Sequence, residues 1–305
     1  MRRVAVLGLG YAGLTFATAV AYRGFNVTGF DTDLERIKAV NSGKAPFYEP
    51  GLEEMLERVV KESRLRAVED HVEAVRASEI VFIFVPTPSG PDGSADLSYV
   101  KRAAEMVGEA LRRTENYKLI VIRSTVPPGT TEGLVKPTVE SVSGRQCGRD
   151  FGLAMNPEFI REGYALEDHF KPSRVVIGEY DKRSGDVLEE FYREFLDGWT
   201  CPMLRVSTYE AELIKYASNT FLALKISFIN SIARICERLP KCDIKAVAEA
   251  VGLDPRIGRH YLNAGLGFGG SCLPKDLRAL IKFVEALGED PSLFKAAYEV
   301  NEGQI

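Results

Sequence analysis

Short apolar runs alternate with amphipathic segments along the first two thirds of the chain. Strands are predicted at the apolar runs, which are residues 4–7, 27–30, 80–85, 119–123, 151–155 and 174–177. Helices are predicted between several of them, at residues 11–23, 33–42, 51–62, 98–112 and 131–140. This alternation indicates an α/β fold with a Rossmann-type, doubly wound parallel sheet. We expect it to form a dinucleotide-binding domain over residues 1–203.

The last third of the chain has a helical pattern. Ser207 and Glu210 have the spacing of a capping box, and neither Gly nor Pro follows before Pro240. One long helix is therefore predicted, and its part over residues 221–235 is apolar on most sides, so it should be buried between elements or subunits. The expected architecture is a central all-helical domain over residues 204–305. Its other predicted helices lie near residues 243–251 and after Pro274 and Pro291.

Composition excludes several classes of function. The net charge is −4 with no basic block, so nucleic acid and anionic membranes are poor partners. Residues 4–22 carry no charge and mimic a signal peptide or a membrane span, but Gly8, Gly10 and Gly13 fall within them at turn spacing. The five cysteines form no CxxC pair, which predicts reduced thiols and a cytoplasmic protein. Widely spaced histidines predict no metal site.

The three glycines fit a G-x-G-x-x-G motif between the first strand and the first helix. A second strand follows and ends at Asp31, which completes the context of a dinucleotide fingerprint. The start of the helix can hold a pyrophosphate, and Asp31 can bind ribose hydroxyls while repelling a 2′-phosphate. NAD is therefore expected rather than NADP. The alternative is a glycine turn in an α/β fold that binds no nucleotide.

Three later strands end in polar or turn-rich motifs. They are Pro86-Thr87-Pro88, the run from Ser124 to Thr130, and Asn156-Pro157-Glu158-Phe159. Ligands of doubly wound sheets bind beyond the carboxyl ends of the strands, so these motifs are expected to form the rim of a site. Ordinary loop prolines are the alternative.

A single thiol stands between a glycine-rich turn and a predicted helix start in residues 267–276, GFGGSCLPKD. Pro274 suits a first helical position, and Cys272 lies just before the unpaired N–H groups, with Lys275 three residues away. Both effects favour a thiolate nucleophile. The alternative is a buried cysteine beside a turn. Lys215 and Asn219 share one face of the long helix, either as site residues or as a solvated stripe.

Together these motifs resemble the UDP-glucose/GDP-mannose dehydrogenase family. The resemblance runs from Val4 to about Asn301 and also includes Tyr48-Glu49-Pro50-Gly51-Leu52, residues 92–98, residues 156–163 and residues 211–219. It implies oxidation of a sugar C6 alcohol to the carboxylate with two NAD. Cys272 would attack the intermediate aldehyde to give a thiohemiacetal, which becomes a thioester that water hydrolyses.

By the same resemblance, Lys215 and Asn219 would stabilise the oxyanion, and Glu158, Thr125 and Asp276 would position and deprotonate water. Arg256 would reach the substrate of a partner subunit in a homodimer built on the long helix. The expected cofactor-binding residues are Gly8, Gly10, Tyr11, Gly13, Asp31, Arg36, Pro86, Thr87, Thr125, Glu162 and Lys275. The expected substrate-binding residues are Glu158, Phe159, Glu162, Lys215, Asn219, Arg256, Tyr261, Asn263, Gly265, Gly269 and Cys272.

Within the family, Tyr48-Glu49-Pro50 and Arg161-Glu162-Gly163 resemble members that convert UDP-glucose to UDP-glucuronate. GDP-mannose and UDP-N-acetyl sugars are the alternative substrates. The family has a C-terminal UDP-binding domain that is absent from this chain, which leaves a non-catalytic nucleotide-binding remnant as another hypothesis. A rival class, the β-hydroxyacid dehydrogenases, also pairs a lysine with an asparagine four residues on, but needs no nucleophilic thiol.

Overall fold

The computed structural model describes residues 2–304, and it divides into two compact units. The first contains the residues up to Thr87 together with Leu97–Leu213, and the second contains Pro88–Asp96 together with the residues from Ile214 on. The domain boundary expected at residues 203/204 stays a prediction.

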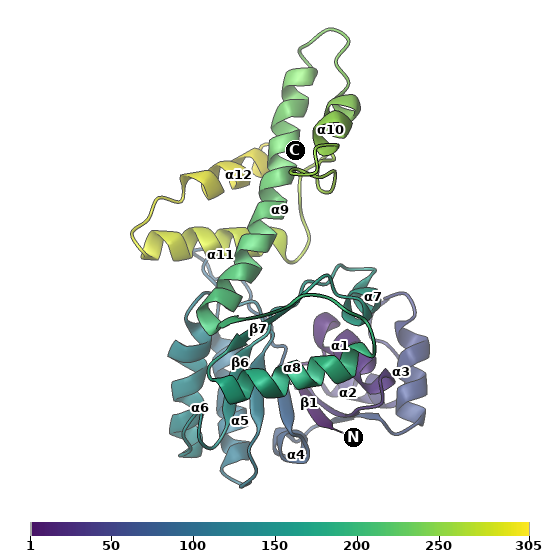
Figure 1. The fold of residues 1–305 in the computed structure, drawn as a ribbon, viewed down its shortest axis with the longest axis vertical. Helices are drawn as coiled ribbons and strands as arrows, with labels where there is room; N and C mark the ends of the chain where they lie inside the picture. Colours follow the sequence, from purple (N-terminus) through teal and green to yellow (C-terminus); the bar gives the residue numbers. More distant parts are fainter. Residues whose placement is uncertain (1, 305) are drawn as a thin grey trace. The chain divides into compact units, whose positions relative to one another are not determined.

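Within residues 2–304, eight strands form one sheet in the first unit, in the order β3-β2-β1-β4-β5-β6-β7-β8 (Figure 1). Every neighbouring pair is parallel except β6 and β7. The expected doubly wound sheet is confirmed, with the correction that β7 and β8 run against the other strands. The strands are β1 Arg3–Leu7, β2 Asn26–Phe30, β3 Leu65–Val68, β4 Ile80–Ile83, β5 Leu119–Ile122, β6 Gly152–Met155, β7 Val175–Glu179 and β8 Met203–Ser207.

Helices cover both faces of this sheet. On one face the aromatic ring of Phe16 from α1 packs against Phe82 of the sheet, and against Phe191 and Phe195 of α8. On the other face α4, α5 and α6 pack side by side. The helices of this unit are α1 Tyr11–Tyr22, α2 Leu34–Asn41, α3 Leu52–Lys61, α4 His71–Ala77, α5 Ser98–Leu111, the π-helix η1 Thr131–Val135, α6 Lys136–Ser143, α7 Ala165–Phe170 and α8 Lys182–Leu196.

The expected elements are present, with ends shifted by a few residues. The sequence pattern missed β3, α4, α7, α8 and β8. Strand β3 has only four residues, and its exposed Arg66 interrupts the apolar run. Helix α8 does have an apolar face, formed by Leu188, Phe191 and Phe195, so this signal was present in the sequence.

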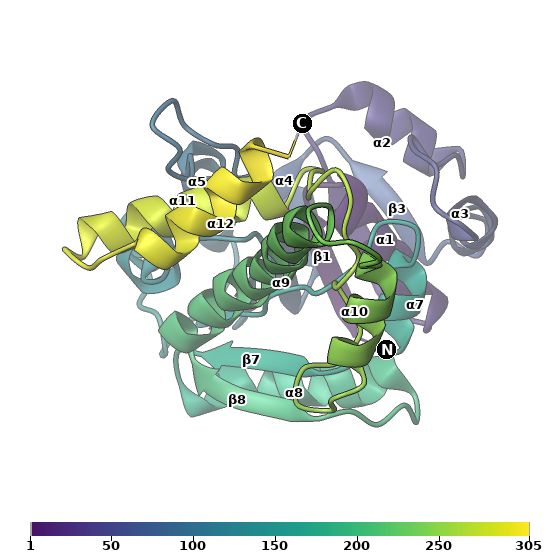
Figure 2. The ribbon, with the colours of Figure 1, turned by 90° about the horizontal axis from the view of Figure 1, so that it is seen from above.

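The long helix α9, Thr208–Cys236, is confirmed, and it spans roughly 44 Å at 1.5 Å per residue. Its capping box is formed as expected. The backbone N–H of Ser207 donates to Oε2 of Glu210 (2.7 Å), and that of Glu210 donates to Oγ of Ser207 (3.2 Å). The helix ends four residues before Pro240. The other helices of the second unit are α10 Ile244–Gly252, α11 Leu273–Ala286 and α12 Ser292–Glu302 (Figure 2).

The second unit also contains residues 88–96, which follow β4 in the sequence but pack with the helices. Ala95 contacts a cluster formed by Tyr216, Ala279 and Leu280. The glycine of Asp92-Gly93-Ser94 has φ +90°, and a Cβ there would lie 3.4 Å from the Arg278 side chain. This segment is therefore shaped to lie against α11, the helix that starts after Cys272.

One expectation about the cysteines is wrong. The structure joins Cys236, the last residue of α9, to Cys242 in a disulfide, with the two Cα atoms 5.1 Å apart. The chain turns back after α9, which brings the two residues within bridging distance although they are six positions apart. The free thiols are those of Cys147, Cys201 and Cys272.

Candidate active site

In the first unit, the loops after parallel strands β1, β4, β5 and β6 lie at one edge of the sheet. Two side chains join the loops after β4 and β5. Oγ1 of Thr87 donates to the carbonyl oxygen of Thr125 (2.8 Å), and Oγ of Ser124 donates to that of Val85 (2.6 Å). The loops after β4 and β5 are therefore adjacent, with Pro86, Thr87 and Thr125 next to one another, and their role as the rim of a site stays a prediction.

The glycine-rich turn after β1 has the geometry of a phosphate-binding loop. Gly8 has φ +96°, and a Cβ on it would collide with the backbone of Phe84. A Cβ on Gly13 would collide with the backbone of Gly8, whereas at Gly10 no atom would lie within 4 Å. Two glycines thus permit tight packing, and the third leaves open space at the start of α1. The pyrophosphate of NAD fits this arrangement.

Asp31 is held beside that turn with only 7% of its side chain exposed. Its Oδ2 accepts a hydrogen bond from the N–H of Leu9 (2.7 Å) and pairs with Nη1 of Arg36 (2.9 Å). Its Oδ1 accepts from the N–H of Asp33 (3.0 Å). The carboxylate is therefore fixed just after β2, where the fingerprint places the ribose contact. The positive charge of Arg36 partly balances its negative charge.

The loop after β6 carries three of the expected site residues. Oε2 of Glu158 accepts from the N–H of Ile160 (2.9 Å), and the Arg174 guanidinium lies 3.8 Å from the ring centre of Phe159. Glu162 is exposed next to Gly163. The loop thus presents Glu158 and Glu162 from the same edge of the sheet as the glycine turn.

Sequence reasoning missed the role of Glu212, which the chain places in the first turns of α9. Its carboxylate is fully buried and accepts from the backbone N–H groups of Gly129 (2.5 Å) and Thr131 (2.7 Å). Burial, and secondarily the nearby Glu132, raise the pKa of Glu212 to about 7. Glu212 thus holds the loop after Thr125.

In the second unit, Cys272 is the N-cap residue of α11, as the sequence predicted, and it is exposed. Its Sγ lies 3.5 Å from Oγ of Ser271. The alternative of a buried cysteine is wrong for this position. It holds for Cys147, which is buried, and burial raises the pKa of its thiol to about 12. Partial burial also raises the pKa of Cys201, so Cys272 is the most exposed of the three free thiols.

A buried polar group lies close to it in sequence and structure. Nδ2 of Asn219 donates to Oδ2 of Asp276 (2.6 Å), and Nζ of Lys275 pairs with its Oδ1 (2.6 Å). Asp276 is 1% exposed and Lys215, one turn from Asn219, is 4% exposed. The alternative of a solvated stripe is therefore wrong. Asn219, Lys275 and Asp276 form one charge-assisted network at the start of α11.

The loop between α10 and α11 carries the remaining expected substrate residues. Arg256 is exposed and pairs with Asp254 (Nη2 to Oδ2, 2.6 Å), and Tyr261 has φ +66°. The N–H of Gly265 donates to Oδ1 of buried Asn230 (2.8 Å). Asn263 and Gly269 are exposed.

Asn301 of α12 fixes the turn before Cys272, and the sequence did not indicate this role. Its Oδ1 accepts from the N–H of Phe268 (2.6 Å), and its Nδ2 donates to the carbonyl oxygen of the same residue (3.0 Å). A side chain on Gly267 would collide with Asn301. The glycine is therefore required for this close approach.

The chain belongs to the UDP-glucose/GDP-mannose dehydrogenase family. Residues 2–196 match the model of the family's NAD binding domain, and residues 209–303 match that of its central domain. The first domain is therefore an NAD-binding domain.

Three relatives illustrate the similarity. UDP-glucose 6-dehydrogenase TuaD of Bacillus subtilis is 45% identical over 305 residues, which are 100% of this chain and 64% of that protein. A GDP-mannose 6-dehydrogenase of Pseudomonas savastanoi pv. phaseolicola is 40% identical, covering 99% of this chain and 68% of its own length. The structure of a UDP-glucose dehydrogenase from the archaeon Pyrobaculum islandicum superposes with a TM-score of 0.95 at 50% identity, covering 99% of this chain and 68% of that one.

The chain thus spans about two thirds of the length of these relatives. Among residues 2–304, no helix has the length and apolar character needed to cross a membrane.

Proposed function

We propose that this protein is an NAD-dependent nucleotide-sugar 6-dehydrogenase that oxidises the C6 alcohol of UDP-glucose to the carboxylate of UDP-glucuronate. The observation that carries the proposal is an exposed cysteine at the start of α11, beside the buried network of Asn219, Lys275 and Asp276. Oxidation of an aldehyde to an acid needs a nucleophile that first adds to the carbonyl carbon. The β-hydroxyacid dehydrogenases, the rival class, have no use for such a thiol.

NAD, when bound at the turn formed by Gly8, Gly10 and Gly13, supplies the hydride acceptor for both oxidations. The chain's own residues would do the rest. Sγ of Cys272 bonds to the aldehyde carbon, and the carbonyl electron pair moves to oxygen. Lys215 and Asn219 stabilise that oxyanion, because an ammonium and an amide N–H in a buried setting interact strongly with developing negative charge.

Hydrolysis of the Cys272 thioester needs an oriented water and a base. We assign this to Asp276 together with Glu158 and Thr125. Glu162 and Lys275 would contact the cofactor. Phe159, Tyr261, Asn263, Gly265 and Gly269 would line the site of the nucleotide sugar, and Arg256 would reach the site of a second subunit.

UDP-glucose is favoured over GDP-mannose by the relatives. UDP-glucose 6-dehydrogenases from Bacillus subtilis and Haloferax volcanii are 45% and 42% identical to this chain, and several GDP-mannose 6-dehydrogenases are 39–40% identical. Because this difference in identity is small, the experiment described below also includes GDP-mannose and a UDP-N-acetyl sugar as substrates.

We further propose a homodimer built on α9 in a cytoplasmic protein. Phe221, Phe228 and Ile235 lie seven residues apart on this helix and are 62%, 52% and 53% exposed. Residues at this spacing fall on one helix face, so the three exposed side chains form an apolar stripe along the helix. A second copy of the same helix would cover the stripe in a two-fold interface.

The test is NADH production from UDP-glucose, GDP-mannose and a UDP-N-acetyl sugar, with the sugar acid quantified. The expected result is two NADH per UDP-glucose and formation of UDP-glucuronate. One NADH per substrate, with an aldehyde or ketone as the product, would favour the rival class. Absence of turnover with every sugar in the longest natural form of the chain, with NAD still bound, would favour a non-catalytic binding protein.

A further inference from the structure

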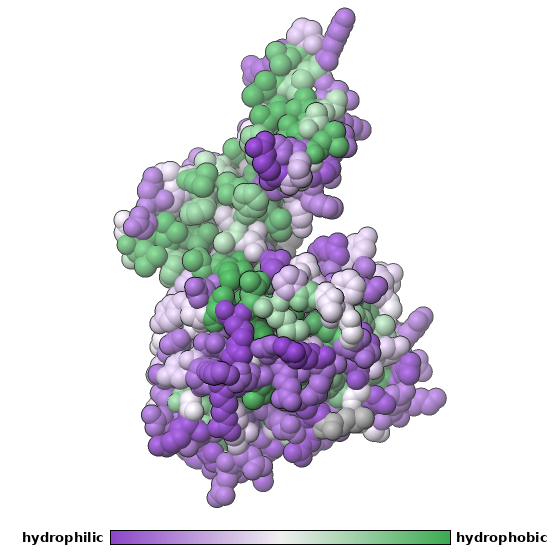
Figure 3. Space-filling view, viewed as in Figure 1, coloured by the Kyte–Doolittle hydropathy of each residue, from purple (hydrophilic) through white to green (hydrophobic). Residues whose placement is uncertain are grey.

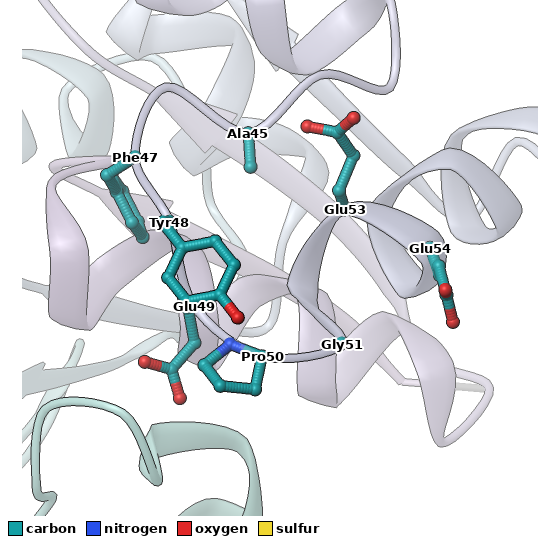
Figure 4. Close-up of a pocket in the computed structure, with 8 residues that line it drawn as sticks. All are labelled: Ala45, Phe47, Tyr48, Glu49, Pro50, Gly51, Glu53 and Glu54. Atoms are coloured by element: carbon teal, nitrogen blue, oxygen red, sulfur yellow. The ribbon is translucent and has the colours of Figure 1, made fainter.

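Glu49 is a buried carboxylate that links three segments of the first unit, and no step proposed above uses it. It lies in the loop between α2 and α3 and is 5% exposed. A surface pocket of about 510 Å³ lies at this loop and is also lined by Glu53 and Glu54. In Figure 4 the Glu49 carboxylate points away from those two acids and toward the ribbon of another segment.

Both oxygens of Glu49 accept hydrogen bonds. Oε1 accepts from the N–H of Ala165 (2.8 Å), and Oε2 accepts from the N–H of Gly163 (2.9 Å) and from the Tyr11 hydroxyl. The N–H of Gly163 also lies 3.1 Å from the Tyr11 hydroxyl oxygen. Burial and the neighbouring Glu49 raise the pKa of Tyr11 to about 12, so Tyr11 keeps its proton and donates.

The three groups that donate hydrogen bonds to Glu49 come from two parts of the first unit with different proposed roles. Tyr11 is the first residue of α1 and belongs to the glycine-rich turn. Gly163 and Ala165 follow directly after Glu162, at the end of the loop that carries Glu158. Gly163 has φ +84°, a conformation that glycine adopts readily and that aims its N–H at Glu49. One buried carboxylate therefore ties the cofactor turn to the loop that carries Glu158 and Glu162.

We propose that Glu49 is a positioning residue that sets the loop of Glu158 and Glu162 relative to the glycine-rich turn. This proposal rests on the proposed function for its catalytic consequence. Two N–H donors and one hydroxyl donor match the acceptor capacity of a carboxylate, whereas an amide at this place would direct an NH₂ group at donors. A small displacement of a positioned catalytic group lowers the rate strongly while leaving the fold intact.

The experiment compares Glu49→Gln, Tyr11→Phe and the matched control Glu53→Gln, an exposed acid of the same pocket, with the unaltered protein. Glu49→Gln should lower kcat/KM for the sugar by about thirtyfold, mainly through kcat, with the dissociation constant for NAD changed by less than about threefold. Tyr11→Phe removes one donor and keeps both backbone bonds, so its loss should be about threefold to fivefold. Glu53→Gln should match the unaltered protein.

A second readout is independent of turnover. Hydrogen exchange of the backbone amides of Gly163 and Ala165 should be at least about tenfold faster in Glu49→Gln, and unchanged in Glu53→Gln. If the protein oxidises none of the sugars, the proposed function fails while this exchange measurement still decides the role of Glu49. A lower melting temperature with unchanged kcat and unchanged exchange would overturn the positioning role and leave only a structural one. If Glu49→Gln does not fold, Tyr11→Phe provides the test, and a kcat equal to that of the unaltered protein would overturn the proposal.

Discussion

The two units of the chain differ in which large apolar side chains they expose. In the first unit these are mostly tyrosines and a tryptophan, such as Tyr48, Tyr99 and Trp199, whose polar atoms can remain hydrated. In the second unit they are mostly phenylalanine, leucine and isoleucine, such as Phe221, Leu253 and Leu266. Figure 3 shows the same contrast, with hydrophobic residues gathered over the helices of the second unit and hydrophilic residues over much of the first.

The difference follows from architecture. The sheet is covered by helices on both faces, and the cluster on one face alone is large, extending from Val4 through Phe82 to Phe195. The helices of the second unit enclose only small clusters, such as those around Ala223 and Ile229. The first unit therefore buries most of its apolar residues, whereas the second leaves more of its phenylalanine, leucine and isoleucine side chains exposed. The chemistry divides in the same way, with the cofactor fingerprint in the first unit and the thiol in the second.

The largest expected effect separates these chemical roles. Cys272→Ser should reduce formation of the sugar acid by a factor of about 10³ or more, because a serine hydroxyl is far harder to ionise than a thiol. NAD binding should be unchanged, since the fingerprint lies in the first unit. Stopped assays that quantify NADH and acid, with calorimetry for NAD, measure both. Acid formed at the normal rate would contradict a covalent role for Cys272.

The apolar stripe on α9 supplies the next test. Phe228→Glu should weaken self-association by about a hundredfold or more, because it places a charge in the proposed interface. Sedimentation velocity at micromolar concentration should show a dimer for the unaltered chain and a monomer for the variant. Tyr99→Glu, at a comparably exposed position on α5 of the first unit, should remain dimeric. A monomer for the unaltered chain would rule out α9 as a dimer interface.

Glu212 should make stability depend on pH. The pKa of Glu212 is raised to about 7 in the folded state. Below about pH 4.5 the carboxyl group is protonated in the folded and the unfolded state, so it does not lower the free energy of unfolding there. As pH rises toward 7 the unfolded state loses its proton first, so the free energy of unfolding should fall, by on the order of 2 kcal/mol, and then level off. Denaturant titrations from pH 4.5 to 8 measure this.

Glu212→Gln should remove that decrease. Glu210→Gln is a control of opposite sign, because hydrogen bonds from Ser207 lower the pKa of Glu210 and its contribution is lost in acid. The same slope in Glu212→Gln as in the unaltered chain would show that another group titrates.

The smallest effect concerns the cofactor. Asp31→Asn should raise the KM for NAD by about tenfold and reduce the preference of the protein for NAD over NADP. The reason is that a carboxylate accepts hydrogen bonds from the ribose hydroxyls of NAD and repels the 2′-phosphate of NADP. Asp33→Asn, two residues on and exposed at the start of α2, should change neither value by more than about twofold. Steady-state kinetics with both cofactors decide. Equal turnover of the unaltered protein with NAD and NADP would show that Asp31 has been misassigned.

Local chemistry explains which features could be predicted from the sequence. The glycine turn, the Ser207–Glu210 capping box and the start of α11 before Pro274 depend on neighbours within a few positions, so their patterns are visible in the chain itself. The same holds for the exposed Cys272 at a helix start. The antiparallel pairing of β7 with β6 is not local, and no pattern of apolar residues distinguishes it from a parallel pairing.

The contacts of two buried acids show what only the tertiary structure decided. Glu49 meets Gly163 across 114 positions, and Glu212 meets Gly129 across 83 positions. In the sequence both are ordinary charged residues, Glu49 before a helix and Glu212 within one, and such residues usually face water. Only the packed chain brings backbone N–H groups to them and excludes the solvent, because burial of a carboxylate requires partners that the fold supplies from distant segments. The sequence by itself determined six of the eight strands, the cofactor turn and the position of the thiol. The tertiary structure decided which acids hold the loops around them.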